Sequence, residues 1–251
     1  MQTTELLPAV TAPSGSVERQ TTLAGRQSEE YAKIMDRFLS AEMNYLAQLK
    51  ACLRRKSVVR GTVKLASGRM SQYYIDCKRT TLDPQGAVLT GHAILDVLRQ
   101  QRLRPDAIGG PTVGADPIVT ATVAVSYLEG KPLPGFLIRK DRKTHGLQKQ
   151  IEGIELKRGL RVIIVDEVCT TGESTLDAID AAEREGFEIL AVLSLVDREE
   201  GGSERIRERK YPYFPVFTAK ELLEDAGDES GASSETTQDT GAPITVNRRS
   251  P

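Results

Sequence analysis

Tryptophan is absent from this 251-residue chain, and only 5% of its residues are aromatic. No apolar run approaches the roughly 20 residues that a membrane-spanning helix needs; the longest extends from Ile189 to Val196. The formal net charge is only −1, which argues against a protein that coats nucleic acid or anionic membranes through bulk electrostatics. Residues 1–15 lack a basic segment followed by an apolar one, so we expect no secretory signal. These absences predict a cytoplasmic protein with neither membrane nor nucleic-acid partners.

Cysteine is also scarce. The three cysteines, Cys52, Cys77 and Cys169, are widely spaced and form no CxxC pair. This spacing argues against a disulfide framework and against a structural zinc site, so we expect no metal held by the protein alone. We expect all three to be small buried side chains in a reducing compartment.

Composition separates a central domain from two tails. Residues 1–27 mix Thr, Ser, Pro and Ala without a sustained period, and residues 224–251 are acidic with almost no large apolar side chain. Such segments bury too little apolar surface to offset the entropy lost on ordering. We therefore expect a disordered N-terminal extension (1–27), one folded domain (28–223) and a disordered acidic tail (224–251).

Within the domain, strand and helix patterns alternate. Strands are expected at 62–65, 73–76, 107–108, 135–139, 160–166, 188–196 and 213–218. Helices are expected at 28–53 with a break near residue 40, at 83–101 with Val88, Ile94, Leu95 and Leu98 as its buried stripe, at 115–128 and at 175–185. Helices between strands imply parallel pairing with right-handed crossovers. The pattern predicts a single, doubly wound α/β domain with a mostly parallel sheet.

The most informative segment follows the apolar strand at 160–166. Asp166 and Glu167 precede a loop, Thr170–Thr175, that offers four hydroxyls, a glycine and the start of a helix. Ligands of open α/β sheets bind at the carboxyl ends of the strands, and a helix N-terminus suits a phosphate monoester. The two acids would repel a phosphate, so we expect them to accept hydrogen bonds from sugar hydroxyls or to stabilise a developing cation. The alternative is an ordinary strand-to-helix turn with a Thr N-cap.

This segment resembles the motif by which type I phosphoribosyltransferases bind 5-phosphoribosyl-1-pyrophosphate (PRPP). The resemblance implies that Asp166 and Glu167 contact the ribose hydroxyls and that the loop holds the 5′-phosphate. The PRPP-binding residues implied in this segment are Asp166, Glu167, Val168, Cys169, Thr170, Thr171, Gly172, Glu173 and Ser174. The chain departs from the usual motif in its Asp-Glu order and at Glu173, which we expect to face solvent.

A second segment, residues 139–146, places four cations and a histidine in eight residues. By itself it is consistent with a solvated loop, or with a flexible lid that closes over pyrophosphate. It resembles the mobile catalytic loop of the orotate phosphoribosyltransferase family. The resemblance implies that Arg139, Lys140, Lys143 and His145 bind PRPP, and that Lys143 or His145 protonates the leaving pyrophosphate.

Three further segments resemble the same family in the same order. Residues 65–76 resemble its orotate-binding segment, residues 110–117 its pyrophosphate-side loop in the Gly-Ala-Asp-Pro form, and residues 195–198 the strand end that carries a base-binding arginine. Departures occur at Ala66 and Gln72. The resemblance implies an orotate site formed by Tyr74, Ile75, Thr170 and Arg198.

Together these resemblances imply a type I phosphoribosyltransferase fold and a pentosyltransferase of UMP biosynthesis. The implied reaction transfers the 5-phosphoribosyl group from PRPP to orotate, giving orotidine 5′-monophosphate and pyrophosphate. They also imply Mg²⁺ bound mainly through PRPP, with Lys143, His145, Asp166 and Glu167 as catalytic residues. A homodimer is implied in which the basic loop reaches the neighbouring site. A phosphoribosyltransferase for another base, and a non-catalytic PRPP-sensing regulator, remain open alternatives.

Overall fold

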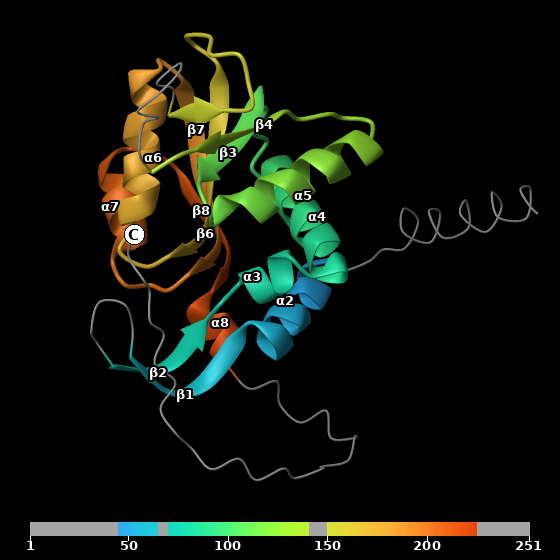
Figure 1. Ribbon diagram of the computed structural model, residues 1–251, viewed down its shortest axis with the longest axis vertical. Helices are drawn as coiled ribbons and strands as arrows, with labels where there is room; N and C mark the ends of the chain where they lie inside the picture. The colour runs from blue at the N-terminus through green and yellow to red at the C-terminus, as the bar shows by residue number, and fades with distance from the viewer. Residues whose placement is uncertain (1–44, 65–69, 141–149, 225–251) are drawn as a thin grey trace, which may run out of the picture. The chain divides into compact units, whose positions relative to one another are not determined.

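The computed structural model describes residues 45–64, 70–140 and 150–224, in which a six-stranded sheet forms the centre of the fold (Figure 1). The strand order is β5-β4-β3-β6-β7-β8, and every neighbouring pair is parallel except β4 with the short edge strand β5. The strands are β3 (Ala107–Pro111), β4 (Gly135–Ile138), β5 (Ile151–Glu152), β6 (Arg161–Cys169), β7 (Glu188–Asp197) and β8 (Tyr213–Thr218). This arrangement confirms the expected mostly parallel α/β sheet.

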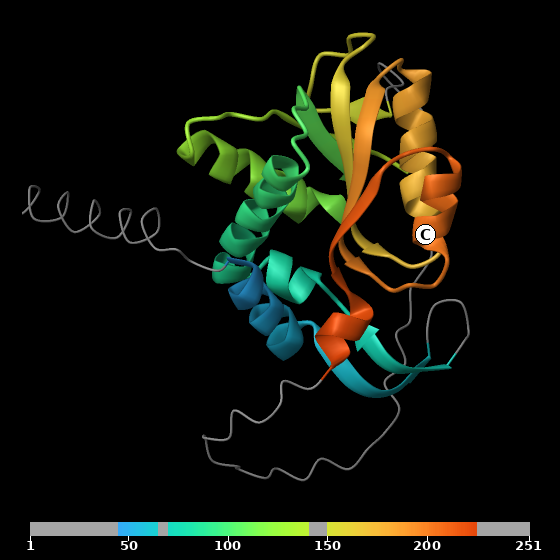
Figure 2. The same ribbon diagram turned by 180° about the vertical axis from the view of Figure 1, so that it is seen from behind.

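Helices cover both faces of this sheet, as Figures 1 and 2 show. α4 (Pro84–Gln100) and α5 (Ala115–Leu128) pack against one face, and α6 (Glu173–Arg184) packs against the other. The central strand β6 serves both layers because successive side chains of a strand point to opposite faces. Ile163 and Val165 pack in the cluster with α4 and α5, while Ile164 packs in the cluster with α6.

A separate antiparallel pair, β1 (Val58–Lys64) and β2 (Met70–Ile75), lies beside α2 (Tyr45–Lys56) and α8 (Ala219–Leu223) (Figure 1). The short helix α3 (Lys78–Thr81) connects β2 to α4, and α7 (Gly202–Glu208) lies between β7 and β8. α3 packs against α2, α4 and α5, and these helices together with the end of β2 place its residues.

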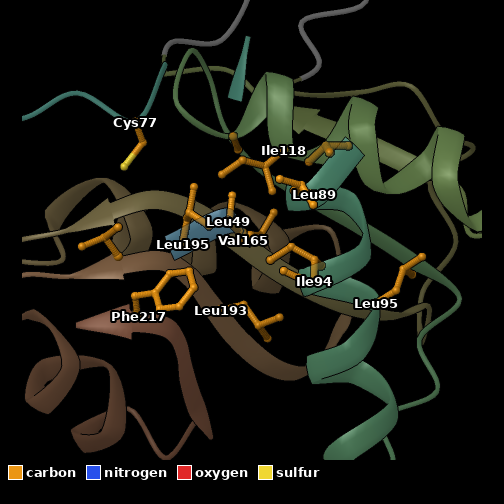
Figure 3. Packing of buried hydrophobic residues seen from close by; sticks show 14 of the residues in the cluster. Leu49, Cys77, Leu89, Ile94, Leu95, Ile118, Val165, Leu193, Leu195 and Phe217 are labelled. Carbon is orange, nitrogen blue, oxygen red and sulfur yellow. The ribbon is translucent and has the colours of Figure 1, made fainter. Parts of the chain in front are cut away.

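The larger hydrophobic cluster joins α2, α4 and α5 to the sheet. Figure 3 shows side chains from all these elements converging, including Leu49, Ile94, Ile118 and Leu193, each of which is fully buried. Burial of one such side chain contributes about 1.5–3 kcal/mol. The carboxyl ends of the strands are therefore anchored on a well-packed core.

The sequence patterns predicted most of these elements. The helix expected at 115–128 and the strand at 213–218 have the expected bounds, and α4 begins where Asp83 caps it, with Asp83 Oδ1 accepting from the Gly86 N–H at 3.0 Å. The expected burial of Val88 is wrong: it is 37% exposed, and Leu89 faces the core instead.

Some elements were missed or were given wrong bounds. The first strand begins at Val58 rather than at residue 62, and the short elements α3, α7, α8 and β5 were not anticipated. The strand expected to end at residue 166 continues to Cys169. Asp166 and Glu167 therefore lie inside β6, in the part that pairs with β7. The part of the helix expected between residues 28 and 44, residues 1–27 and the tail after Glu224 lie outside the described residues.

All three cysteines are buried and free, as expected. Among the helices in the described ranges, none has both the length and the apolar character that a membrane crossing requires.

Candidate active site

A cavity of about 670 Å³ opens at the carboxyl edge of the central strands. It is lined by the ends of β3, β4 and β6, by the loop after β6 and by the first turns of α6. Many of the residues proposed from the sequence meet here: Arg139, Lys140, residues 166–168 and residues 170–174. The parallel sheet explains this convergence, because the carboxyl ends of parallel strands lie along one edge.

Asp166 is bound by the loop that follows it. Its side chain is 5% exposed, and Oδ2 accepts hydrogen bonds from Ser174 Oγ at 2.8 Å and Thr175 Oγ1 at 2.7 Å. Oδ1 accepts the backbone N–H of Glu167 at 2.7 Å. Burial raises the pKa of the Asp166 carboxyl, and these three hydrogen bonds only partly offset that effect. Asp166 thus joins the end of β6 to the first turn of α6.

Glu167 has a different environment, although it is 6% exposed and adjacent in sequence. Lys78 Nζ pairs with Oε2, whereas Oε1 is buried without a hydrogen-bond partner among the described residues. Burial raises the pKa of Glu167, and the contact with Lys78 opposes this rise. For Lys78, burial acts against the charge, but Glu167 and Asp76 outweigh it and raise the pKa of the amine. The pair thus leaves one buried carboxylate oxygen of Glu167 without a partner among the described residues.

The loop after β6 is held in place by contacts with α7. Gly172 has a positive φ of 74°, and a Cβ atom there would lie 3.1 Å from Gly202. The Gly202 N–H donates to the Thr170 carbonyl at 3.0 Å, and Arg205 Nη1 donates to the Thr171 carbonyl at 2.6 Å. With two loop carbonyls facing α7, the loop can direct N–H groups toward a phosphate at the start of α6.

The loop after β3 forms another part of the cavity wall, next to the acid pair. Residues 111–114 line it without contributing a charged side chain, and the peptide bond between Thr112 and Val113 is cis. A Cβ on Gly114 would lie 3.2–3.3 Å from Glu167 and Asp166 atoms, and a Cβ on Gly110 would overlap the Val165 carbonyl. Glycine at both positions allows this loop to approach the acid pair closely.

The basic segment begins at the rim of the cavity. Arg139 and Lys140 are exposed, and Arg139 Nη1 lies 3.6 Å from Glu152 Oε1. Arg139 and Gln150 are joined by two hydrogen bonds, from the Arg139 N–H to the Gln150 carbonyl at 2.9 Å and from Gln150 Nε2 to the Arg139 carbonyl at 3.0 Å. Lys143 and His145 lie between these positions, outside the described residues, and their roles stay predictions.

Cys169 does not line the main cavity. It is 1% exposed, and its sulfur packs beneath the loop against Gly202, so only its backbone could serve a ligand there. Burial raises the pKa of its thiol to about 11. Glu173 is exposed, as expected, and it also borders the cavity.

A second cavity of about 390 Å³ contains the predicted base-binding arginine. The side chain of Arg198 is 8% exposed, pairs with Glu200 at 2.8 Å and lies over the Tyr73 ring with Cζ 5.0 Å from the centroid. Its backbone N–H donates to the Cys169 carbonyl at 2.9 Å, which places it beside the end of β6. Tyr74 and Ile75 line neither cavity, and the Ile75 side chain packs in the core.

Lys78 and Tyr73 were not identified from the sequence. Tyr73 is next to the predicted Tyr74, and the alternation of side chains along β2 turns it toward Arg198 instead. Lys78 lies far from Glu167 in sequence, so only the folded arrangement brings the two together.

Fold and cavity define a protein built to bind a phosphorylated sugar at the carboxyl edge of a parallel sheet. Residues 82–221 match the family described as "Phosphoribosyl transferase domain". The orotate phosphoribosyltransferase of Aquifex aeolicus (strain VF5) is 41% identical over 185 residues, covering 74% of this chain and 100% of that protein. A solved structure of the Mycobacterium tuberculosis H37Rv orotate phosphoribosyltransferase, in complex with Fe(III) dicitrate, is 37% identical with a TM-score of 0.64, covering 72% of this chain and 99% of that chain. Another structure of that enzyme, in complex with PRPP, is 35% identical with a TM-score of 0.60, covering 71% and 98%.

The chain therefore belongs to the orotate phosphoribosyltransferase family, within the type I phosphoribosyltransferases.

Proposed function

We infer that this protein transfers the 5-phosphoribosyl group of PRPP to orotate, giving orotidine 5′-monophosphate and pyrophosphate for UMP synthesis. The observation that carries this inference is one cavity that combines a buried acid pair, a loop rich in hydroxyls at the start of α6, and cations from two other elements. Its relative from Mycobacterium tuberculosis has been solved with PRPP bound.

The proposed roles follow the geometry of the cavity. The loop at 170–174 binds the 5′-phosphate through backbone N–H groups and hydroxyls, aided by the positive end of the α6 dipole. Glu167 accepts a ribose hydroxyl through Oε1, while Asp166 holds Ser174 and Thr175 in place. We propose that Thr170 and Arg198 contact orotate, with Arg198 pairing with its carboxylate, and that the backbone at Tyr74 and Ile75 meets the edge of its ring.

Displacement of pyrophosphate breaks the bond between C1′ and the pyrophosphate oxygen and forms a bond from C1′ to a ring nitrogen of orotate. The ribose becomes cationic while the leaving group gains negative charge. Preorganised charges are the expected catalytic device. The acid pair favours the cationic ribose, and Arg139, Lys140, Lys143 and His145 favour the leaving pyrophosphate. We propose Lys143 or His145 as the group that donates a proton to it.

We propose that Mg²⁺ enters this site with PRPP. Among the described residues, no group of three or more His, Cys, Asp or Glu side chains is arranged to hold a metal ion. Oε1 of Glu167, which we assign above to a ribose hydroxyl, is a hard oxygen that would also suit a cation carried mainly by substrate oxygens. When bound, the ion would neutralise charge on the leaving pyrophosphate.

The activity is tested by mixing the protein with PRPP, orotate and Mg²⁺ and following the absorbance of orotate. Adenine, hypoxanthine and uracil serve as alternative acceptors. We expect orotate consumption alone. Turnover of another base without orotate would replace the assignment by a different phosphoribosyltransferase, and PRPP binding without any turnover would favour the non-catalytic regulator.

We propose that the protein is a homodimer in which the basic loop reaches the neighbouring site. An apolar surface cavity of about 630 Å³ beside α5, with Tyr127 73% exposed and Leu128 61% exposed, supports an interface between chains. Mixing two inactive variants, Lys143→Ala and Glu167→Gln, tests the sharing: activity should reappear in mixed dimers. A dimer whose loops act only within their own chain would stay inactive.

We also propose a cytoplasmic location and a single folded domain at residues 28–223. Three buried, unpaired thiols are consistent with a reducing compartment.

A further inference from the structure

Lys78 is positively charged, and none of the roles proposed so far gives it a contact with a substrate. It belongs to α3, immediately after β2, and its side chain is 41% exposed while lining the main cavity. Arg139 and Lys140, the other cations that line this cavity among the described residues, enter it from the end of β4. Lys78 therefore brings positive charge to the cavity from a different element.

The position of Lys78 is fixed by Glu167. Nζ pairs with Glu167 Oε2, and Asp76 Oδ1 is 3.9 Å away, beyond hydrogen-bond distance. A lysine ammonium carries three N–H donors. Glu167 accepts one of them, so the ammonium can contact Glu167 and a bound anion together.

The neighbouring wall of the cavity is the loop at 111–114. Gly114 approaches the side chain of Glu167 closely, since a Cβ there would lie 3.2 Å from Glu167 Cβ. The loop itself contributes Pro111, Thr112, Val113 and Gly114, which carry no charge. An anion lying along this wall would face two carboxylates, Asp166 and Glu167, and Lys78, which is paired with Glu167, would supply a compensating charge beside them.

We propose that Lys78 binds the pyrophosphate group of PRPP, beside the ribose that Glu167 holds. This inference rests on the proposed function, because it names a ligand contact within the same site. Lys78 orients Glu167 through Oε2, leaves Oε1 to the ribose, and supplies from α3 the charge that the loop at 111–114 lacks.

Binding of fragments tests this role, because inorganic pyrophosphate and ribose 5-phosphate report on the two ends of PRPP separately. Titration calorimetry with Mg²⁺ present would compare the wild type with Lys78→Met, Lys78→Gln and Lys78→Arg. Arg79→Met is the matched control, since Arg79 is the next residue of α3, is exposed and does not line the cavity.

We expect Lys78→Met and Lys78→Gln to weaken pyrophosphate binding about 10- to 100-fold, as loss of one charge-assisted contact would. Ribose 5-phosphate binding should weaken clearly less than pyrophosphate binding, because Lys78 affects the ribose only through Glu167. Lys78→Arg should retain most of the pyrophosphate affinity, and Arg79→Met should match the wild type. In the full reaction, the KM for PRPP should rise in Lys78→Met.

Equal weakening of both fragments by Lys78→Met and Lys78→Gln would overturn the proposal, because it would show that Lys78 acts only through Glu167. Unchanged pyrophosphate affinity would overturn it as well. A wild-type protein that binds pyrophosphate through Lys78 but consumes no orotate would refute the orotate assignment and leave the Lys78 contact supported.

Discussion

Asp166 and Glu167 are adjacent on β6 and almost equally buried, at 5% and 6% exposure, yet their carboxylates have different partners. Asp166 accepts one hydrogen bond from the backbone N–H of Glu167 and two from the hydroxyls of Ser174 and Thr175 in α6. Glu167 is held by one lysine and keeps one oxygen without a partner among the described residues. The pleat of the strand causes this difference, because it turns Asp166 toward α6 and Glu167 toward α3. Burial alone does not distinguish a structural carboxylate from one that is poised for a ligand; the number of satisfied oxygens does.

The largest effect is expected from Glu167→Gln. The substitution preserves size but removes the charge that favours a cationic ribose, so kcat should fall about 10²- to 10³-fold. The thermal midpoint at neutral pH should not fall, because no loop hydrogen bond depends on the side chain of Glu167 and the substitution removes a buried charge. Steady-state kinetics and a melting curve on the same preparation check both expectations. A drop in the melting midpoint as large as that of the Asp166 variant would contradict the division of roles.

Asp166→Asn should act mainly on stability. The new amide cannot accept all three hydrogen bonds of the carboxylate, so a buried donor such as the backbone N–H of Glu167 would be left without an acceptor. Such a group costs about 1–3 kcal/mol, so the free energy of unfolding should decrease by that amount. Urea denaturation measures it directly. If Asp166→Asn loses activity without losing stability, Asp166 contacts the ribose in the way that the sequence motif implies.

The pH dependence of stability separates the two acids further. Burial raises the folded-state pKa of both carboxyls above the unfolded values of 3.8 for Asp166 and 4.5 for Glu167. Their contribution to stability is therefore complete below those values and is lost as pH rises through the folded-state pKa. Each tenfold difference in the acid dissociation constant between the folded and unfolded states corresponds to about 1.4 kcal/mol.

Glu167→Gln should remove its share of this loss, so the variant should lose less stability than the wild type between pH 4.5 and neutrality. Denaturant titrations across that range provide the measurement. Parallel curves for the two proteins would show that Glu167 does not titrate abnormally.

The smallest effect is expected at Arg198, a buried cation that pairs with Glu200 and packs against an aromatic ring. Arg198 lies over the Tyr73 ring, and its Nε is buried without a partner among the described residues. A cation–π contact is worth about 0.5–1 kcal/mol, so Tyr73→Ala should raise the KM for orotate about two- to fivefold. Tyr73→Phe should leave it unchanged, because the ring face remains. A loss in Tyr73→Phe would instead assign the effect to the hydroxyl.

Local patterns predicted the elements that depend on local chemistry. α4 begins at a capping Asp83 followed by Pro84, and β6 forms from a run of β-branched side chains that both layers bury. Short elements such as α3 and α7 escaped prediction because they have too few residues to show a period, and their positions depend on neighbours. Val88 was misassigned for a related reason: one residue of difference turns a helical side chain by about 100°.

Residue types along the chain are enough to establish the chemistry of this protein, namely the acid pair, the loop of hydroxyls and the segments that place it with the orotate phosphoribosyltransferases. Each of these features is a short run of consecutive residues, so its residue types can be recognised along the chain before its surroundings are known. The tertiary structure alone decided how the acids are used. Asp166 accepts hydrogen bonds from side chains of α6, Glu167 pairs with Lys78, and Arg198 stacks on Tyr73. Each of these partners belongs to a different element of the fold. Hydrogen bonds and ion pairs act over a few ångströms of space, and only folding sets those distances.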